Sequence, residues 1–345
     1  MERNVAIANP AIKLADNEMI KIRGRHTVVN GMLAFDWTNS GFAFNFIGTG
    51  FILSLGEYSY EQPAYVKIII DGGRRQRFAV VNGQEKLIIE GLSNKRHRAE
   101  VLKVTESDVP LLFDTVALLG KDASLRNPPF VSRRRIEFIG DSITAGYGAL
   151  GGVNDPTYQT FQQDGTYSYA YLTAEMLGAD GRFICNSGKG IVCNCEGNRE
   201  DVKAGQYCSY LTRKGGECND GWQADVVVIN IGTNDSGGPA GEEEFKDAAR
   251  ALIEKVRSRY PECIIIWMYG LMSQYYAETL RGFIRDYSEI DDKVHFLFVD
   301  TMFGNELETG ANGHPNVKAH TRAANLLAKK VRALTGWITK ETTEE

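Results

Sequence analysis

The sequence lacks any apolar run long enough to cross a lipid bilayer as a helix. Its most apolar stretches, "ADVVVINIG" and "CIIIWMYG", are far shorter than the roughly 20 residues that a membrane-spanning helix needs. The first 20 residues, "MERNVAIANPAIKLADNEMI", also lack the uninterrupted apolar core of a signal peptide. We therefore expect no membrane association, and a cytoplasmic location unless a leader has been removed.

An excess of basic residues is also missing. The 345 residues include 39 Lys and Arg against 44 Asp and Glu, which gives a formal net charge of -5. A nucleic-acid-binding protein is expected to have a basic stripe, whereas basic clusters such as "SRRR" at 132–135 are short and typical of a solvated linker. We expect no nucleic-acid partner. With 43% hydrophobic and 24% charged residues, the chain resembles an ordinary globular protein that can bury a sizeable core.

Cysteine is absent from the first half of the chain, and the six cysteines of the second half lack the spacing of common zinc sites. Cys193 and Cys195 are one residue apart, not two, and Cys208 and Cys218 follow at long intervals. We interpret them as free thiols, as expected in a reducing compartment. A metal site, or a disulfide if the protein is exported, is the alternative. We expect no metal and no organic cofactor.

The first 130 residues show short alternating apolar runs separated by turn signals. Examples of these runs are "GFAFNFIGTGFILSLG", "AYVKIIIDGG" and "HRAEVLKVTE". Asp71-Gly72-Gly73 and Asn82-Gly83 are typical of hairpin turns, because Asn, Asp and Gly tolerate positive φ. Short strands at this spacing predict an all-β sandwich or jelly roll over 1–130. Pro128-Pro129 marks the boundary to a second domain over 131–345.

In the second domain, predicted strands alternate with predicted helices. The strands are expected in "RRIEFIG", "GRFICNSG", "ADVVVINIGTND", "CIIIWMYG" and "VHFLFVD". Residues 242–260 repeat apolar side chains at three- and four-residue spacing and precede Pro261, which predicts an amphipathic helix. A last helix is expected to begin near Asn316-Val317. This alternation predicts an α/β fold, with a parallel sheet flanked by helices.

Polar and glycine residues follow four of these strands at the edge where an open α/β sheet binds its ligands. They are Ser142, Gly188 or Gly190, Asn234 and His314. Each alone has an ordinary structural explanation: Asp and Ser cap helices, Asn favours turns, and a lone histidine is usually at the surface. His320 falls within a helical pattern, and we interpret it as a packing or surface residue. In this order they suggest a serine nucleophile, a histidine base and oxyanion donors.

Four segments, "GDSITAGYG", "NSGKG", "GTND" and "GHPN", resemble the four sequence blocks of the SGNH or GDSL hydrolases. The β-rich first domain, with "FNFIGTGFILSL" and "GLSNKRHRAEVLKVTE", resembles that of the family 2 carbohydrate esterases. The resemblance implies an SGNH-hydrolase fold preceded by a jelly roll, and removal of O-acetyl groups from plant cell-wall sugars, xylan above all. It implies Ser142 as the nucleophile and His314 as the base. The backbone N–H of Ser142, Gly190 (with Gly188 as the alternative) and Asn234 would form the oxyanion hole.

One departure from the SGNH pattern concerns the aspartate that usually precedes the histidine. Ala311 and Asn312 occupy those positions here. Three groups could orient His314: the side-chain oxygen of Asn312, a backbone carbonyl near the motif, or a carboxylate from elsewhere in the chain. We favour the backbone carbonyl.

Three functions remain open from the sequence. The first is a serine esterase acting on acetylated xylan or xylo-oligosaccharides. The second is an SGNH lipase or thioesterase acting on other short-chain acyl esters, and the third is a carbohydrate-binding protein with an inactive hydrolase domain. The expected partner is an acetylated oligo- or polysaccharide. The sequence leaves the oligomeric state open, a homo-oligomer included.

Overall fold

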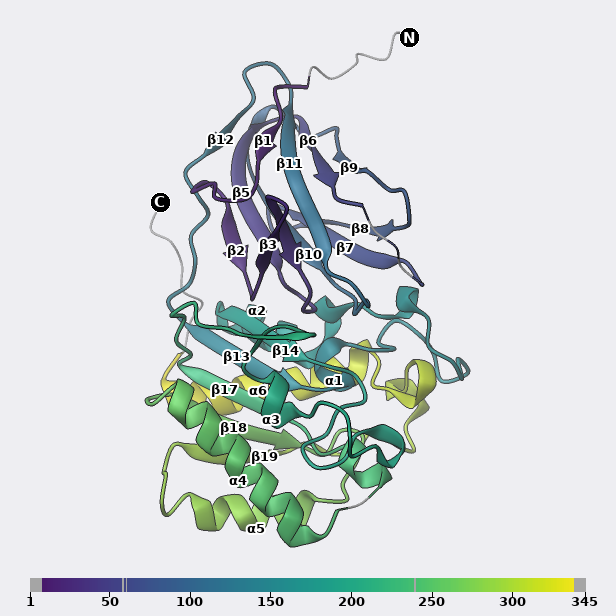
Figure 1. The fold of residues 1–345 in the computed structure, drawn as a ribbon, viewed down its shortest axis with the longest axis vertical. Helices are drawn as coiled ribbons and strands as arrows, with labels where there is room; N and C mark the ends of the chain where they lie inside the picture. Colours follow the sequence, from purple (N-terminus) through teal and green to yellow (C-terminus); the bar gives the residue numbers. More distant parts are fainter. Residues whose placement is uncertain (1–7, 58, 60, 239, 338–345) are drawn as a thin grey trace. The chain divides into compact units, whose positions relative to one another are not determined.

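The chain divides into two compact units, Met1–Val131 and Ser132–Glu345 (Figure 1). The structure is a computed structural model, and it describes residues 8–57, 59, 61–238 and 240–337.

The first unit is made of antiparallel β-strands arranged in two six-stranded sheets. One sheet has the order β3-β4-β11-β6-β9, with β1 pairing β11; the other has the order β12-β5-β10-β7-β8, with β2 pairing β5. The strands are β1 (Ile12–Lys13), β2 (Lys21–Arg23), β3 (Thr27–Val29), β4 (Met32–Phe35), β5 (Gly41–Gly48), β6 (Gly50–Leu55), β7 (Ala64–Ile70), β8 (Arg74–Val80), β9 (Lys86–Ile89), β10 (Lys95–Lys103), β11 (Leu111–Leu119) and β12 (Ser124–Arg126). The predicted all-β architecture is confirmed.

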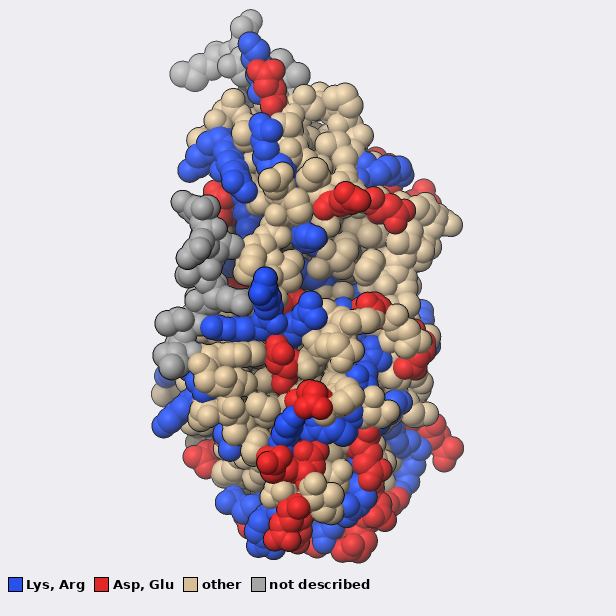
Figure 2. All heavy atoms as spheres, turned by 90° about the vertical axis from the view of Figure 1, so that its left-hand side faces the viewer, with Lys and Arg blue, Asp and Glu red and all other residues tan. Residues whose placement is uncertain are grey.

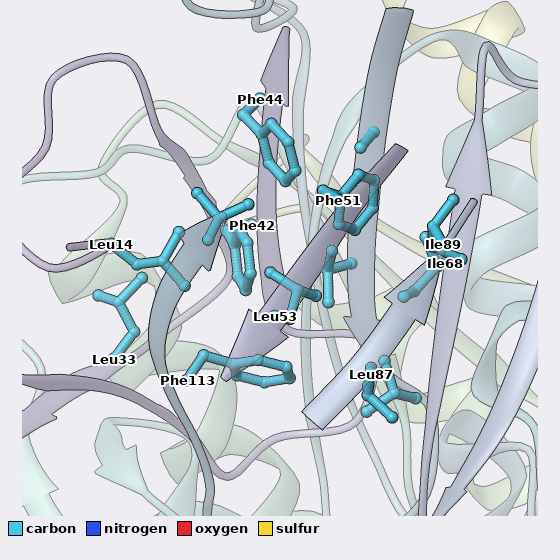
Figure 3. Close-up of a cluster of buried hydrophobic side chains, with 14 of the residues drawn as sticks. Leu14, Leu33, Phe42, Phe44, Phe51, Leu53, Ile68, Leu87, Ile89 and Phe113 are labelled. Carbon is cyan, nitrogen blue, oxygen red and sulfur yellow. The ribbon is translucent and has the colours of Figure 1, made fainter. Parts of the chain in front are cut away.

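The core of this unit is rich in phenylalanine (Figure 3). Alternate residues of β5, namely Phe42, Phe44 and Phe46, lie on one face of the strand, because successive side chains point to opposite faces, and all three are fully buried. Phe44 meets Phe51 of β6 edge to face, with ring centroids 5.1 Å apart, and Phe42 meets Phe113 at 5.2 Å. These edge-to-face contacts join strands of the two sheets.

The second unit contains a five-stranded parallel sheet of order β14-β13-β17-β18-β19. Its strands are β13 (Arg135–Gly140), β14 (Asp180–Cys185), β17 (Val226–Asn230), β18 (Ile264–Tyr269) and β19 (Val294–Phe298). The chain reverses its direction of travel across the sheet between β13 and β17, so their carboxyl ends form the switch point where ligands of open α/β sheets bind. The predicted parallel sheet is confirmed.

Helices cover both faces of this sheet (Figure 1). α4 and α5 lie on the face turned toward the viewer, and α6 lies on the opposite face, packed against α2. The helices are α1 (Ser142–Ala145), α2 (Tyr169–Leu177), α3 (Ala204–Tyr207), α4 (Glu242–Arg259), α5 (Ala277–Tyr287) and α6 (Val317–Thr335). α4 ends one residue earlier than its apolar repeat predicts, because Tyr260 leaves helical geometry before Pro261.

The sequence did not predict one feature of the second unit, and it left the packing or surface position of His320 open. A short hairpin, β15 (Tyr210–Thr212) with β16 (Gly215–Glu217), lies in the cysteine-containing segment between β14 and β17. His320 on α6 is completely buried, and its Nδ1 accepts a hydrogen bond of 3.2 Å from the backbone N–H of Tyr169. This bond ties the start of α2 to α6.

The surface displays charges of both signs. Figure 2 shows Lys and Arg side chains interspersed with Asp and Glu over much of the face that it displays, as the nearly balanced charge counts would lead one to expect. None of the helices within the described ranges is long and apolar enough to span a bilayer.

Candidate active site

Ser142 lies at the tight turn that follows β13. The strand ends at Gly140, Asp141 caps the short helix α1 by accepting the Ile143 N–H at 3.0 Å, and Ser142 is the first helical residue. A Cβ atom on Gly140 would lie 1.9 Å from Thr144 Oγ1, so the turn requires glycine at this position. The chain therefore passes directly from the end of β13 into α1, and Ser142 lies at the N-terminus of this helix.

His314 lies beside Ser142, although 172 residues separate them in the chain. The imidazole Nε2 is 2.9 Å from Ser142 Oγ, and Nδ1 is 2.9 Å from the main-chain oxygen of Asn312. Because a carbonyl oxygen only accepts hydrogen bonds, Nδ1 must hold the proton, which leaves Nε2 as the acceptor for the serine hydroxyl. This is the tautomer that a general base needs.

Asn312 presents its backbone, and not its side-chain amide, to the imidazole. It has left-handed dihedral angles, φ 50° and ψ 39°, in the short turn Ala311–Gly313. Its N–H donates to the Asp155 carbonyl at 2.7 Å, while its side-chain Nδ2 reaches toward Tyr147 Oη at 3.4 Å. The structure thus places a backbone carbonyl where the SGNH pattern usually has an aspartate.

Asn234 follows β17 at the same edge of the sheet. Its Nδ2 donates to Asp141 Oδ2 at 3.1 Å and to the Lys189 carbonyl at 3.0 Å. The first bond links Asn234 directly to the turn that holds Ser142. The second links it to the loop that contains Gly188 and Gly190.

Gly188 and Gly190 differ in whether their backbone N–H has an acceptor. Its N–H donates to Asn194 Oδ1 at 3.0 Å, so this hydrogen is already used within the loop. The N–H of Gly188 has no acceptor in the part of the chain that the structure describes, and Gly188 has a positive φ of 76° that suits glycine. The N–H of Gly188 is therefore the more available of the two, and which glycine donates to the oxyanion stays a prediction.

Asp235, which sequence reasoning did not single out, joins two of these loops. Its carboxylate is fully buried and accepts hydrogen bonds from three successive backbone N–H groups, those of Ile191, Val192 and Cys193, at 2.8–3.2 Å. Such a run of N–H groups forms an anion-binding concavity. Burial raises the pKa of Asp235, while the three donors act in the opposite direction. The position directly after Asn234 in "GTND" was the signal that could have identified it.

Glycine at position 190 has a structural reason of its own. A Cβ atom there would lie 2.4 Å from Asp235 Oδ2 and 2.1 Å from the Cys193 carbonyl. The close approach of Asp235 to this backbone therefore excludes any larger residue.

A buried polar network stabilises the turn at 140–145 that contains Ser142, which we call the nucleophile turn. Thr144 Oγ1 and Tyr169 Oη are 2.8 Å apart, and burial raises the pKa of the Tyr169 hydroxyl. His320, which bonds the Tyr169 N–H, has its pKa lowered by burial to about 3 and is therefore neutral. These groups maintain the turn without ionising near neutral pH.

The cysteines form no disulfide with one another. All six are free thiols, and Cys195 is the exposed one. Among the residues with described positions, no three His, Cys, Asp or Glu side chains are grouped so that they could hold a metal ion.

Comparison with known proteins places this geometry in a family. Residues 138–322 match the GDSL-like lipase/acylhydrolase model, a span that includes Ser142, Asn234 and His314. The chain belongs to the GDSL-like lipase/acylhydrolase family. Residues 22–129 match the carbohydrate esterase 2 N-terminal model, which confirms the resemblance of the first unit to that of family 2 carbohydrate esterases.

Individual proteins that are similar to this GDSL-family chain are esterases, in agreement with both family matches. It is 29% identical over 316 residues to the cellulase/esterase CelE of Acetivibrio thermocellus, covering 87% of this chain and 38% of the relative. It is 20% identical over 331 residues to an acetylxylan esterase/glucomannan deacetylase of Cellvibrio japonicus, covering 94% and 91%. A family two carbohydrate esterase from Clostridium thermocellum, solved in complex with cellohexaose, is 27% identical with a TM-score of 0.82, covering 92% of this chain and all of that one.

Proposed function

We propose that this protein is a serine esterase that removes O-acetyl groups from plant cell-wall carbohydrates, with acetylated xylan or xylo-oligosaccharides as the substrate class. The observation that supports it most strongly is the 2.9 Å contact between Ser142 Oγ and His314 Nε2, together with the backbone carbonyl that fixes the imidazole tautomer. A serine is activated when its hydroxyl is hydrogen-bonded to a base and a third group orients that base.

The reaction follows from this geometry in two steps. Ser142 Oγ attacks the acetyl carbonyl carbon while His314 Nε2 takes the hydroxyl proton, and His314 then gives this proton to the sugar oxygen as the ester bond breaks. The acetyl group is now bonded to Ser142. A water molecule, deprotonated by the same Nε2, attacks the acyl-enzyme and releases acetate, which restores the serine hydroxyl.

The oxyanion of each tetrahedral intermediate needs donors at the same edge of the sheet. We assign this role to the backbone N–H groups of Ser142 and Gly188 and to Asn234 Nδ2. Both amide hydrogens of Asn234 have acceptors in this structure, Asp141 and the Lys189 carbonyl. The bond to Asp141 holds the amide in place, so the substrate oxygen would share or replace the Lys189 carbonyl as the acceptor of the second amide hydrogen.

A carbohydrate ester is favoured over a lipid ester by the first unit and by the relatives. The carbohydrate esterase 2 N-terminal match and the acetylxylan esterase and cellohexaose-bound relatives all concern proteins that act on or bind sugars. The chain spans only 38% of CelE, so the activity of that larger protein is not transferred as a whole.

The test is a comparison of acyl groups and sugars on the purified chain. We expect acetate release from acetylated xylo- and manno-oligosaccharides, and faster hydrolysis of 4-nitrophenyl acetate than of the butyrate or octanoate ester. Asn234→Ala should lower kcat by roughly 10²–10³-fold, the usual effect of losing one oxyanion donor. A preference for octanoate would identify a lipase, and binding of oligosaccharide without turnover would identify a binding protein.

A further inference from the structure

The imidazole of His314 is covered on one side by an aromatic ring. The ring centroids of Tyr147 and His314 are 4.3 Å apart with an interplanar angle of 44°. Behind Tyr147, the ring of Tyr158 stacks at 3.7 Å and 16°, which makes a layered group of three rings. We call Tyr158, Tyr147 and His314 the aromatic stack.

The aromatic stack is attached to the nucleophile turn at both of its tyrosines. The backbone N–H of Tyr147 donates to the Ser142 carbonyl at 3.1 Å, so this ring is held by the residue that carries the nucleophile. Tyr158 Oη donates to Gln163 Oε1 at 2.6 Å, and the buried Gln163 donates through Nε2 to the Ala145 carbonyl at 3.0 Å. These hydrogen bonds to Ser142 and Ala145 of α1 therefore fix the positions of both tyrosine rings.

The loop containing His314 is attached to the same segment. Ala311 N–H donates to the Gly148 carbonyl at 3.0 Å, next to Tyr147. A Cβ atom on Gly148 would lie 2.5 Å from the Ala311 carbonyl and 3.2 Å from His314 Cβ, so the two loops are in close contact. The backbone contacts between the two loops, together with the contact between the rings themselves, thus keep Tyr147 beside the imidazole.

We propose that Tyr147, backed by Tyr158, is a positioning residue that stabilises the imidazolium form of His314 and so supplies part of what a carboxylate would provide. The inference rests on the proposed function, in which His314 becomes positively charged as Ser142 attacks. A backbone carbonyl bears a partial charge only and stabilises that cation less than an aspartate would. The face of an aromatic ring is electron-rich and attracts a cation within about 6 Å of its centroid.

Other titratable groups surround His314 on the elements packed against it. Asp141 on the nucleophile turn accepts from the Ile143 N–H and Asn234 Nδ2, and Asp155 Oδ2 accepts from the Gly152 N–H at 2.8 Å. His320 on α6 is neutral because burial lowers its pKa to about 3. Because Tyr147→Phe keeps the ring beside these groups, a change in the titration of His314 that occurs only in Tyr147→Leu reports on the ring.

The test compares Tyr147→Leu, which removes the ring, with Tyr147→Phe, which keeps the ring and removes only the hydroxyl. The pKa of His314 is measured by NMR titration of its ring protons, assigned with His314→Ala, and kcat/KM for 4-nitrophenyl acetate is measured from pH 5 to 9. Thermal unfolding confirms that both variants are folded.

We expect Tyr147→Leu to lower the pKa of His314 and to reduce kcat/KM at pH 7 by roughly tenfold, mainly through kcat. Tyr147→Phe should retain the wild-type pKa and a rate within about threefold. An unchanged His314 pKa in Tyr147→Leu would overturn the inference, as would equal losses in both variants, which would assign the effect to the hydroxyl. Because the NMR titration needs no turnover, an inactive wild-type enzyme would refute the proposed function separately.

Discussion

Substitutions at Asn312 provide a sharp test of how His314 is oriented. The structure assigns this role to the main-chain oxygen of Asn312, 2.9 Å from Nδ1, and every substitution retains that oxygen. What the side chain contributes is tolerance of the left-handed backbone at φ 50°, since asparagine and glycine adopt it more readily than other residues. The longer contact of 3.4 Å between Nδ2 and Tyr147 Oη adds little.

The magnitude follows from the conformational cost. The left-handed region costs an ordinary L-residue roughly 1–2 kcal/mol, and asparagine less. Asn312→Ala should therefore disfavour the bent loop by about 1 kcal/mol and reduce kcat/KM by less than about tenfold. Asn312→Gly should stay near the wild-type rate, and the β-branched Asn312→Val should be the most impaired of the three.

The assay is hydrolysis of 4-nitrophenyl acetate, with His314→Ala as the reference for complete loss of the base, at least roughly 10³-fold. Thermal unfolding checks that each variant is folded. If a folded Asn312→Gly is as inactive as His314→Ala, the side-chain amide and not the backbone carbonyl orients the histidine, and our interpretation of the structure is wrong.

Two further substitutions test other parts of the site, and a third tests an ion pair between Glu308 and Arg322. Ser142→Ala should abolish turnover without lowering the unfolding temperature; a rate within tenfold of wild type would exclude Ser142 as the nucleophile. Asp235→Asn should lower kcat by roughly 10²-fold with little change in KM, because a neutral amide accepts more weakly than a carboxylate and its NH2 group cannot accept the Ile191 N–H that Oδ2 accepts; an unchanged kcat would contradict this role. Glu308→Gln should lower the free energy of unfolding by about 1 kcal/mol at pH 7, because the hydrogen bond from Arg322 lowers the pKa of Glu308 in the folded state. That difference should be full above pH 4.5, the ordinary value, and disappear as the pH falls through the lowered pKa; denaturant titrations that show the same difference at pH 3 would refute it.

Several elements of the fold could be predicted because their signals are local. α4 follows from the apolar repeat between its acidic first turn and Pro261, and α6 begins where Asn316 caps it by accepting the N–H groups of Lys318 and Ala319. In the first unit, the turn between β7 and β8 needs positive φ at Asp71 and Gly72, and these residue types supply it. The hairpin β15–β16 was missed because three-residue strands have too few positions to show alternation.

Choices between neighbouring residues depended on contacts that no local pattern shows. Gly188 and Gly190 both follow β14, and the sequence pattern fits either as an oxyanion donor. They differ in a contact of the folded chain, the hydrogen bond from the Gly190 N–H to Asn194 Oδ1. For His320 the sequence left a packing and a surface position open, and the packing of α2 against α6 buries it completely.

The sequence by itself determined that a serine, a glycine loop, an asparagine and a histidine follow four of the five strands of a parallel sheet, because strand ends and helix starts are encoded by neighbouring residues. The tertiary structure alone decided what orients His314. That choice depends on the left-handed backbone of Asn312 and on its N–H bond to the Asp155 carbonyl, between residues 157 positions apart that only the folded chain brings together. Hydrogen bonds between distant loops follow from the whole fold, and therefore cannot be inferred from the spacing of residues within one motif.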